Sequence, residues 1–215
     1  MDYIAVLDHD HLDNGIFLTA FARSLGSHKG KRGLIIHGDS AYTDRLIQTG
    51  VMREDAELRA IRDLNHRLIA LLADNGISAI GLNGHQRSIL SFDGEGFQLN
   101  RQELERLPDT PHIVLSSLFS NHTTGATDVI PLQQMALVLQ KRLNIEDVII
   151  FNMDDSEEII DRTTPESVSA RDLGHTFPSE RVPVEFRNPS MDLKLMSARS
   201  FARYPEEKKV VIIRP

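Results

Sequence analysis

The sequence of 215 residues contains no cysteine. Without a thiol the chain can form neither a disulfide nor a thiolate metal site, and it has no cysteine nucleophile. Basic residues are also in the minority, since 24 Lys and Arg face 31 Asp and Glu and give a formal net charge of -7. Binding to nucleic acid or to an anionic membrane requires a surplus of positive charge, so we expect neither partner.

Long apolar segments are missing as well. No run approaches the roughly 20 residues of a membrane-spanning helix. Residues 1–8 contain no basic stretch ahead of an apolar core, as a signal peptide would. We therefore expect a cytoplasmic protein. The composition, with 40% hydrophobic and 26% charged residues, is that of an ordinary globular chain, long enough for one large domain or two small lobes.

Short apolar segments alternate with amphipathic ones along most of the chain. Helix-separated strands of this kind favour a mostly parallel sheet, which predicts an α/β fold with a central sheet between layers of helices. Residues 152–190 have weak periodicity and are expected to be rich in loops. The predicted strands are 4–7, 34–36, 77–80, 88–92, 97–99, 112–115, 148–151 and 210–213, and the predicted helices are 12–25, 40–50, 54–75, 132–143 and 191–204.

Two stretches are similar to the amino acid kinase family, and above all to acetylglutamate kinases. The first is Leu34-Ile35-Ile36-His37-Gly38-Asp39-Ser40 with Thr49-Gly50-Val51 after it. It resembles the family's buried strand, His-Gly-Gly-Gly turn and Gly-Val pair. The second runs from Asn65 to Gly76 and continues through Ala79-Ile80-Gly81-Leu82-Asn83-Gly84. It resembles a family helix that begins with Asn and the Ala-Val-Gly-Leu-Ser-Gly strand that follows.

The resemblance implies one amino acid kinase-like domain, a three-layer α/β sandwich. Residues 1–107 would correspond to the substrate lobe and residues 108–215 to a reduced nucleotide lobe. Family members transfer the γ-phosphoryl group of ATP, so ATP and Mg are the implied cofactors, and an acyl amino acid or a nucleotide is the implied ligand. The resemblance also implies a homodimer that packs through helices of the first half, and a place in arginine biosynthesis.

The same resemblance implies a set of site residues. Lys194, within Met191-Asp192-Leu193-Lys194-Leu195-Met196-Ser197-Ala198, matches the catalytic lysine of a Met-x-x-Lys-x-x-Ala helix and would also contact the nucleotide. Asn152 follows the strand that leads into the nucleotide site. The residues implied in substrate binding are His37, Gly38, Asp39, Ser40, Arg53 and Asn65.

Much of the family's phosphoryl-transfer chemistry is missing from this sequence. The reaction depends on lysines and glycine turns that neutralise and position phosphate oxygens. Asp8 stands where the family has its first lysine, Asp39 and Ser40 replace two glycines, and Ile130-Pro131-Leu132 replaces an Asn-Ala-Asp triplet. Because Lys194 alone matches, we expect acetylglutamate kinase-like activity to be weak or lost, as in a degenerate enzyme.

Two alternatives belong to other classes of protein. One is a non-catalytic module that senses an amino acid or a nucleotide and needs no cofactor. The other is a metal-dependent hydrolase, because His9, His11 and Asp13 nearly match the His-x-His-x-Asp-His run of metallo-β-lactamase-like enzymes, in which zinc activates water. Asn14 stands in place of the final histidine. The other interpretation of His9, His11 and Asp13 is a solvated loop after the first strand.

Overall fold

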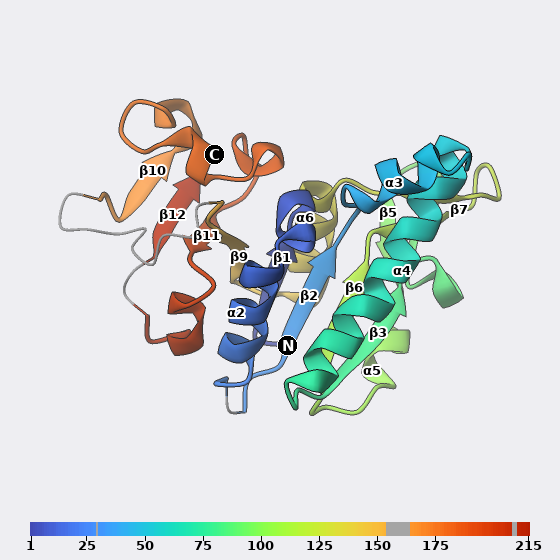
Figure 1. Cartoon of the computed structure of the whole chain (residues 1–215), viewed down its shortest axis with the longest axis horizontal. Coiled ribbons are helices and arrows are strands. Elements are labelled where there is room, and N and C mark those ends of the chain that lie inside the picture. Colours follow the sequence, from blue (N-terminus) through green and yellow to red (C-terminus); the bar gives the residue numbers. More distant parts are fainter. Residues whose placement is uncertain (29, 154–163, 208–209) are drawn as a thin grey trace.

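A computed structural model describes residues 1–28, 30–153, 164–207 and 210–215. Its main feature is an eight-stranded sheet with the order β10-β12-β11-β9-β1-β2-β6-β3 (Figure 1). Every neighbouring pair is parallel except β11 and β12. Its strands are β1 (Tyr3–Leu7), β2 (Gly33–His37), β3 (Ala79–Asn83), β6 (His112–Ser116), β9 (Val148–Phe151), β10 (Ser167–Ser169), β11 (Leu193–Met196) and β12 (Val211–Arg214).

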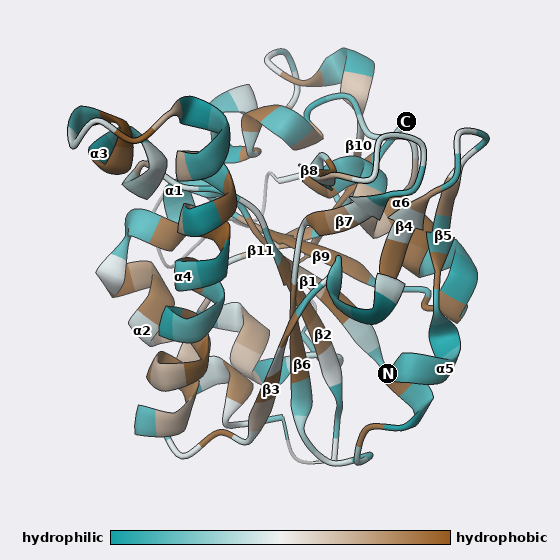
Figure 2. Ribbon diagram, turned by 90° about the vertical axis from the view of Figure 1, so that its right-hand side faces the viewer, coloured by the Kyte–Doolittle hydropathy of each residue, from teal (hydrophilic) through white to brown (hydrophobic). Residues whose placement is uncertain are grey.

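Two layers cover the faces of this sheet. Helices α2 and α4 pack on one face, and helix α6 and a smaller sheet of order β5-β4-β7-β8 pack on the other (Figures 1 and 2). The helices are α1 (His9–Asp13), α2 (Gly15–Leu25), α3 (Tyr42–Gln48), α4 (Arg53–Asp74), α5 (Arg101–Glu105) and α6 (Leu132–Leu143). The smaller sheet contains β4 (Leu90–Phe92), β5 (Phe97–Leu99), β7 (Leu118–Asn121) and β8 (Thr127–Val129).

Burial on both faces explains the apolar runs of the central strands. In β1, Ile4 and Val6 pack in the core under α6, whereas Tyr3, Ala5 and Leu7 pack under α2 and α4. A strand covered on both sides reads as a continuous hydrophobic run rather than as an alternation. Figure 2 shows these strands as the brown centre of the molecule. The predicted α/β class with a mostly parallel sheet is confirmed.

The prediction of a helix at residues 191–204 was wrong. Residues 193–196 form β11, inserted between β9 and β12, and only Ser200–Arg203 turn as a short 3-10 helix. Leu193 and Leu195 are fully buried while Lys194 between them is half-buried, which is the alternation of a strand. The spacing of Met191 and Leu195 also fits a helix face, so the pattern alone was ambiguous.

Smaller differences concern element boundaries. The helix predicted at 12–25 is interrupted at Asn14, whose side chain accepts the backbone N–H groups of Ile16 and Phe17 and caps α2. The strand predicted at 88–92 begins only at Leu90, because Ser88 has a positive φ of 50°. In the described part of the chain, no helix is both long enough and apolar enough to cross a membrane.

The side chain of Asn65 extends from α4 toward the sheet and packs against β3 at Gly81, where no side chain blocks it. The Asn65 side chain is 2% exposed and lies directly over Gly81 in β3. A Cβ atom at Gly81 would overlap Asn65 Oδ1 and would lie 2.9 Å from Ile69 Cγ1. The close approach of α4 to β3 therefore requires a residue without a side chain at this position.

We predict that Gly81→Ala lowers the free energy of unfolding by about 1–3 kcal/mol, the range typical of an overpacked core. Urea titration measures this loss. Gly15→Ala is the matched control, because a Cβ at Gly15 meets no atom within 4 Å and the residue lies in the first turn of α2. Its stability should be unchanged or slightly higher. Equal effects of the two substitutions would contradict the steric argument.

Candidate functional site

The carboxyl ends of four parallel strands meet at one edge of the sheet. Leu7 is in register with His37, His37 with Ser116, and Ser116 with Asn83. The residues that follow these strands therefore lie at the same level of the fold. In open α/β sheets this edge is where ligands usually bind. We call this region the carboxyl edge.

His37 supports the carboxyl edge from within. It is fully buried, its Nδ1 lies 3.1 Å from the carbonyl oxygen of Gly38, and its Nε2 lies 3.0 Å from Asn65 Nδ2. A carbonyl oxygen only accepts, so Nδ1 carries the proton and Nε2 accepts from the amide. Burial lowers the pKa of His37 to about 4, which keeps the ring neutral. His37 and Asn65 are thus brought together beneath the turn.

The turn after β2 uses its own backbone N–H groups. Asp39 Oδ1 accepts the N–H of Ser40 at 2.6 Å, and Ser40 Oγ accepts the N–H of Tyr42 at 3.1 Å. Asp13 Oδ2 accepts the N–H of Ala41 at 2.8 Å. Glycine turns ahead of helices bind anions with such N–H groups. Here two carboxylates and a hydroxyl of the chain itself already occupy them.

Carboxylates also crowd the carboxyl edge. Burial raises the pKa of Asp8, and burial with the nearby Asp8 raises the pKa of Glu185. Burial with the nearby Asp39 raises the pKa of Glu57. These shifts show that the folded chain brings like charges together in partly desolvated surroundings. Arg53 lowers the pKa of Glu57 and offsets part of this crowding.

A cleft of about 750 Å³ opens beside these carboxylates. It runs between the start of α4 and the segment around β8. No Lys or Arg is among the described residues that line it. The lining residues are Glu54, Asp55, Glu57, Leu58, Ala126, Thr127, Asp128, Val129, Pro131 and Glu185.

Lys194 lies away from the turn after β2. Its partner in register on β9 is Ile149, and its Nζ is 2.5 Å from Oδ1 of Asp147, the residue ahead of β9. Asp147 also accepts a hydrogen bond of 2.5 Å from the hydroxyl of Tyr204. The ammonium group therefore faces the end of the sheet opposite to Gly38.

The other two residues implied by the resemblance also have local roles. Arg53 is exposed, and its guanidinium lies 3.9 Å from the carboxylate of Asp44. Asn152, directly after β9, is buried, and its backbone N–H donates to the carbonyl of Met196 at 3.0 Å. Arg53 lies close enough to Glu57 to lower its pKa, and Asn152 follows β9 beside β1, whereas Lys194 lies apart from the turn.

The zinc hydrolase hypothesis is contradicted by the positions of its three residues. His9 is exposed, whereas His11 is buried against Phe17, with ring centroids 4.1 Å apart. His11 Nε2 lies 3.2 Å from the carbonyl of Asn152, and Asp13 is bound to the start of α3. Within the described residues, no three His, Cys, Asp or Glu side chains are arranged to hold a metal ion.

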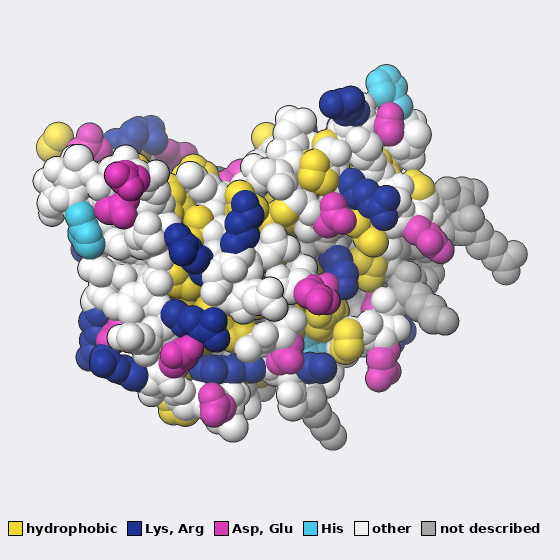
Figure 3. Space-filling view, turned by 180° about the vertical axis from the view of Figure 1, so that it is seen from behind, with side chains coloured by type: hydrophobic (Ala, Val, Ile, Leu, Met, Phe, Trp, Pro, Cys, Tyr) yellow, Lys and Arg dark blue, Asp and Glu magenta, His cyan; other side chains and the backbone are white. Residues whose placement is uncertain are grey.

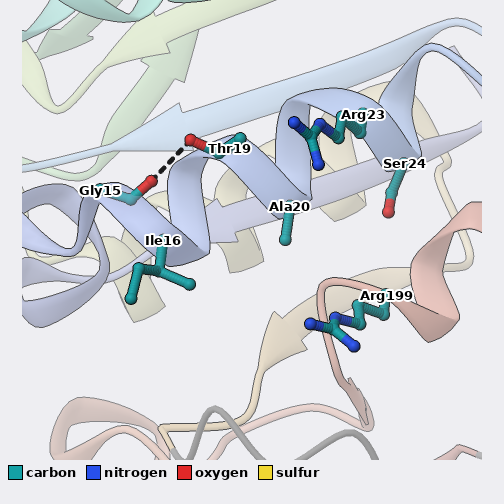
Figure 4. Close-up of a pocket in the computed structure, with 7 residues that line it drawn as sticks. All are labelled: Gly15, Ile16, Thr19, Ala20, Arg23, Ser24 and Arg199. Carbon is teal, nitrogen blue, oxygen red and sulfur yellow. Dashed lines mark hydrogen bonds between the residues drawn. The ribbon is translucent and has the colours of Figure 1, made fainter.

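A further cavity, of about 480 Å³, lies between α2 and the segment after β11. Figure 4 shows Ile16, Ala20 and Ser24 on the side of α2 that faces Arg199. Arg23 adds a second guanidinium to the lining. None of the site residues that the sequence predicted lines this cavity.

The sequence reasoning missed Glu57, Glu185 and Ser117. Glu57 is one of several acidic residues on α4, and Glu185 lies in a segment without periodicity, so neither has a local signal. Ser117 is fully buried next to Gly38, and its Oγ has no hydrogen-bond partner among the described residues. Glu57 and Glu185 meet only in the folded chain, where both line the cleft, and Ser117 follows β6 at its carboxyl end.

No protein-family model and no curated protein sequence matches this chain significantly. Several solved structures do. N-acetylglutamate synthase from Neisseria gonorrhoeae is similar with a TM-score of 0.62 and 18% identity, over 100% of this chain and 59% of that protein. Isopentenyl phosphate kinase from T. acidophilum has a TM-score of 0.62 at 12% identity, over 100% of both chains. Aspartate kinase from Synechocystis has a TM-score of 0.68 at 14% identity, over 100% of this chain and 40% of that one.

These neighbours have the amino acid kinase fold, and they confirm the predicted fold. At such low identities the likeness concerns the fold alone. This chain spans 59% of the synthase and a smaller share of the aspartate kinase.

The neutral, buried His37 predicts a loss of stability in mild acid. Its pKa is about 4 in the folded chain and 6.5 in an unperturbed histidine. The unfolded state therefore binds the proton first, and stability falls as the pH drops from about 7 toward 4. Between pH 8 and pH 5 this group should remove about 2 kcal/mol.

His37→Gln tests this dependence, because glutamine can both donate to Gly38 and accept from Asn65. We expect urea titrations at pH 8 and pH 5 to show a stability loss about 2 kcal/mol smaller for His37→Gln than for the original chain. The remaining histidines and carboxylates are the same in both chains and cancel in the comparison. The same loss in both would show that His37 does not cause the effect.

Proposed function

We propose that this chain, which has the amino acid kinase fold, is a small-molecule-binding module in which phosphoryl transfer to an acyl amino acid is weak or lost. The main support is the turn after β2. Asp39 and Asp13 accept N–H groups that a glycine turn would offer to an oxyanion. A phosphate or substrate carboxylate would have to displace charges that belong to the chain.

The charges around the turn support the same proposal. The triphosphate of ATP carries several negative charges, and Asp8, Glu57 and Glu185 are all close to the carboxyl edge. Two like charges about 4 Å apart repel each other by about 4 kcal/mol at a dielectric constant of 20. Since the described lining of the cleft offers no lysine or arginine to offset this repulsion, the phosphates of ATP do not fit these residues.

The acidic cleft suits a ligand with a cationic group, such as the amino or guanidinium group of an amino acid. Carboxylates with raised pKa values would gain a counter-charge on binding. The synthase from Neisseria gonorrhoeae, which shares this fold, was crystallised with coenzyme A and L-arginine. A protein that contains this fold can therefore have an activity other than that of a kinase. We favour an amino-acid-sensing role over a nucleotide-sensing one.

Kinase activity is tested by a coupled assay of ADP release with MgATP and N-acetylglutamate. We expect turnover below about 0.01 per second, compared with the 1–1000 per second of typical enzymes. Thermal unfolding in the same buffers should show stabilisation by L-arginine and none by MgATP. Turnover at an ordinary enzyme rate would contradict the proposed loss of catalysis. Stabilisation by MgATP but not by L-arginine would show that the ligand is a nucleotide rather than an amino acid.

The catalytic role of Lys194 remains a prediction of the resemblance, and its ion pair with Asp147 predicts a different result. We expect Lys194→Met to lower stability by less than about 1 kcal/mol, because the pair is partly exposed. Amino acid binding should not change. Lys141→Met, on the exposed side of α6, is the control. If Lys194→Met removed an ADP-release activity without altering stability, the lysine would be catalytic.

The lobe boundary at residue 107, the homodimer and the place in arginine biosynthesis also remain predictions. They rest on the resemblance, and the contacts within this single chain do not address them.

A further inference from the structure

A separate cavity lies at the opposite edge of the sheet, where the strands begin. Its volume is about 360 Å³. Three segments form it: residues 25, 26, 28 and 30–32 ahead of β2, residues 76–78 ahead of β3, and residues 109, 110 and 112 at the start of β6. We call it the amino-edge cavity. Neither the turn after β2 nor the acidic cleft contributes a residue to it.

Arg32 lines this cavity and has a donor without a partner among the described residues. Its Nε donates to the carbonyl of Pro111 at 3.0 Å, which fixes the guanidinium in place. Its Nη1 lies 3.7 Å from a carboxylate oxygen of Asp109, whose side chain is fully exposed. Its Nη2 is buried and has no hydrogen-bond partner among the described residues. A buried charged donor without an acceptor is costly, so this group favours a ligand that accepts.

His112 presents a second donor. The residue is 8% exposed and lines the cavity, and its Nδ1 accepts the N–H of Gly33 at 2.9 Å. A neutral imidazole that accepts at Nδ1 carries its proton on Nε2. Within the described part of the chain, Nε2 makes no hydrogen bond. Burial first, and then the neighbouring His28 and Arg32, lower the pKa of His112 to about 4. The ring is therefore a neutral donor beside the guanidinium of Arg32.

Lys31 adds a second full charge. It lines the cavity and makes no ion pair within the described residues. Lys31 and Arg32 thus outweigh Asp109, the one carboxylate among the described lining residues, which is turned to solvent. In Figure 3, Lys and Arg side chains gather along the lower border of the molecule, where the strands begin, with acidic side chains between them.

We propose that the amino-edge cavity binds a small oxyanion, the phosphate or carboxylate group of a metabolite, through Arg32 Nη2, His112 Nε2 and the ammonium of Lys31. An oxyanion offers several acceptor lone pairs, which matches three donors of this kind, two of them charged. The cavity is large enough for a small organic anion around that group. This site is independent of the proposed function at the carboxyl edge.

The test uses the full chain with inorganic phosphate and, separately, acetate as probes, at constant ionic strength. The NMR signals of His112 and the thermal midpoint are followed as each anion is added. We expect phosphate to raise the pKa of His112 and to stabilise the fold, because a bound anion offsets the nearby positive charges. Lys31→Glu should weaken phosphate binding at least about tenfold, since it removes a charge-assisted contact and adds a repulsive charge.

Lys141→Glu is the matched control, because it makes the same charge change on α6, outside the cavity lining. It should bind phosphate like the original chain. Lys31 is only half-buried, and the thermal midpoint without anion checks that its variant folds. Binding of phosphate alone or of both probes, lost in Lys31→Glu, would support the proposal and identify the group. An unchanged His112 signal with both anions, or an equal loss in Lys141→Glu, would overturn it.

Discussion

The carboxyl edge of this protein depends on one buried amide. Nδ2 of Asn65 lies 3.0 Å from the ring of His37 and 3.2 and 3.3 Å from the carbonyl oxygens of Leu82 and Val114. A single side chain of α4 thereby joins the ends of β2, β3 and β6. Since a buried amide is costly unless it is paired, these contacts fix the distance between the helix and the sheet. The absence of a side chain at Gly81 makes this geometry possible.

The turn above this amide shows how a fold can be kept while its chemistry changes. His37 holds the carbonyl of Gly38, so the direction of the turn does not depend on a ligand. Asp39 and Asp13 then satisfy N–H groups at the start of α3 from within the chain. Carboxylates near a helix start are stabilising, which gives these residues a structural benefit. That benefit places negative charge where a phosphate would otherwise lie.

The sequence predicted the parts of the fold that have a local cause. Continuous apolar runs such as 34–36 marked strands buried on both faces, and the long periodic segment 54–75 marked α4. The resemblance implied His37 and Asn65 in substrate binding, which stays a prediction, and the structure shows that both are buried and in contact with each other. The prediction of a helix at residues 191–204 was wrong because a four-residue strand and one face of a helix can have the same spacing of apolar residues. The meeting of Asp8 with Glu185 depends on tertiary structure, which no local pattern encodes.

The two edges of the sheet carry cavities with different linings, acidic at one and mainly basic among the charged residues at the other, and β2 connects them. It begins at Gly33, beside His112, and ends at His37, beside Asn65. The four steps from Gly33 to His37 span roughly 13 Å, which is more than the Debye length of about 8 Å at physiological ionic strength. Charges at the two edges are therefore largely screened from each other through solvent. A ligand at one edge could influence the other only through the packing of β2, where the ring of Tyr3 lies directly over Gly33 and leaves no room for a side chain. Such a tightly packed strand resists gradual distortion, so the simplest expectation is that the two sites act independently.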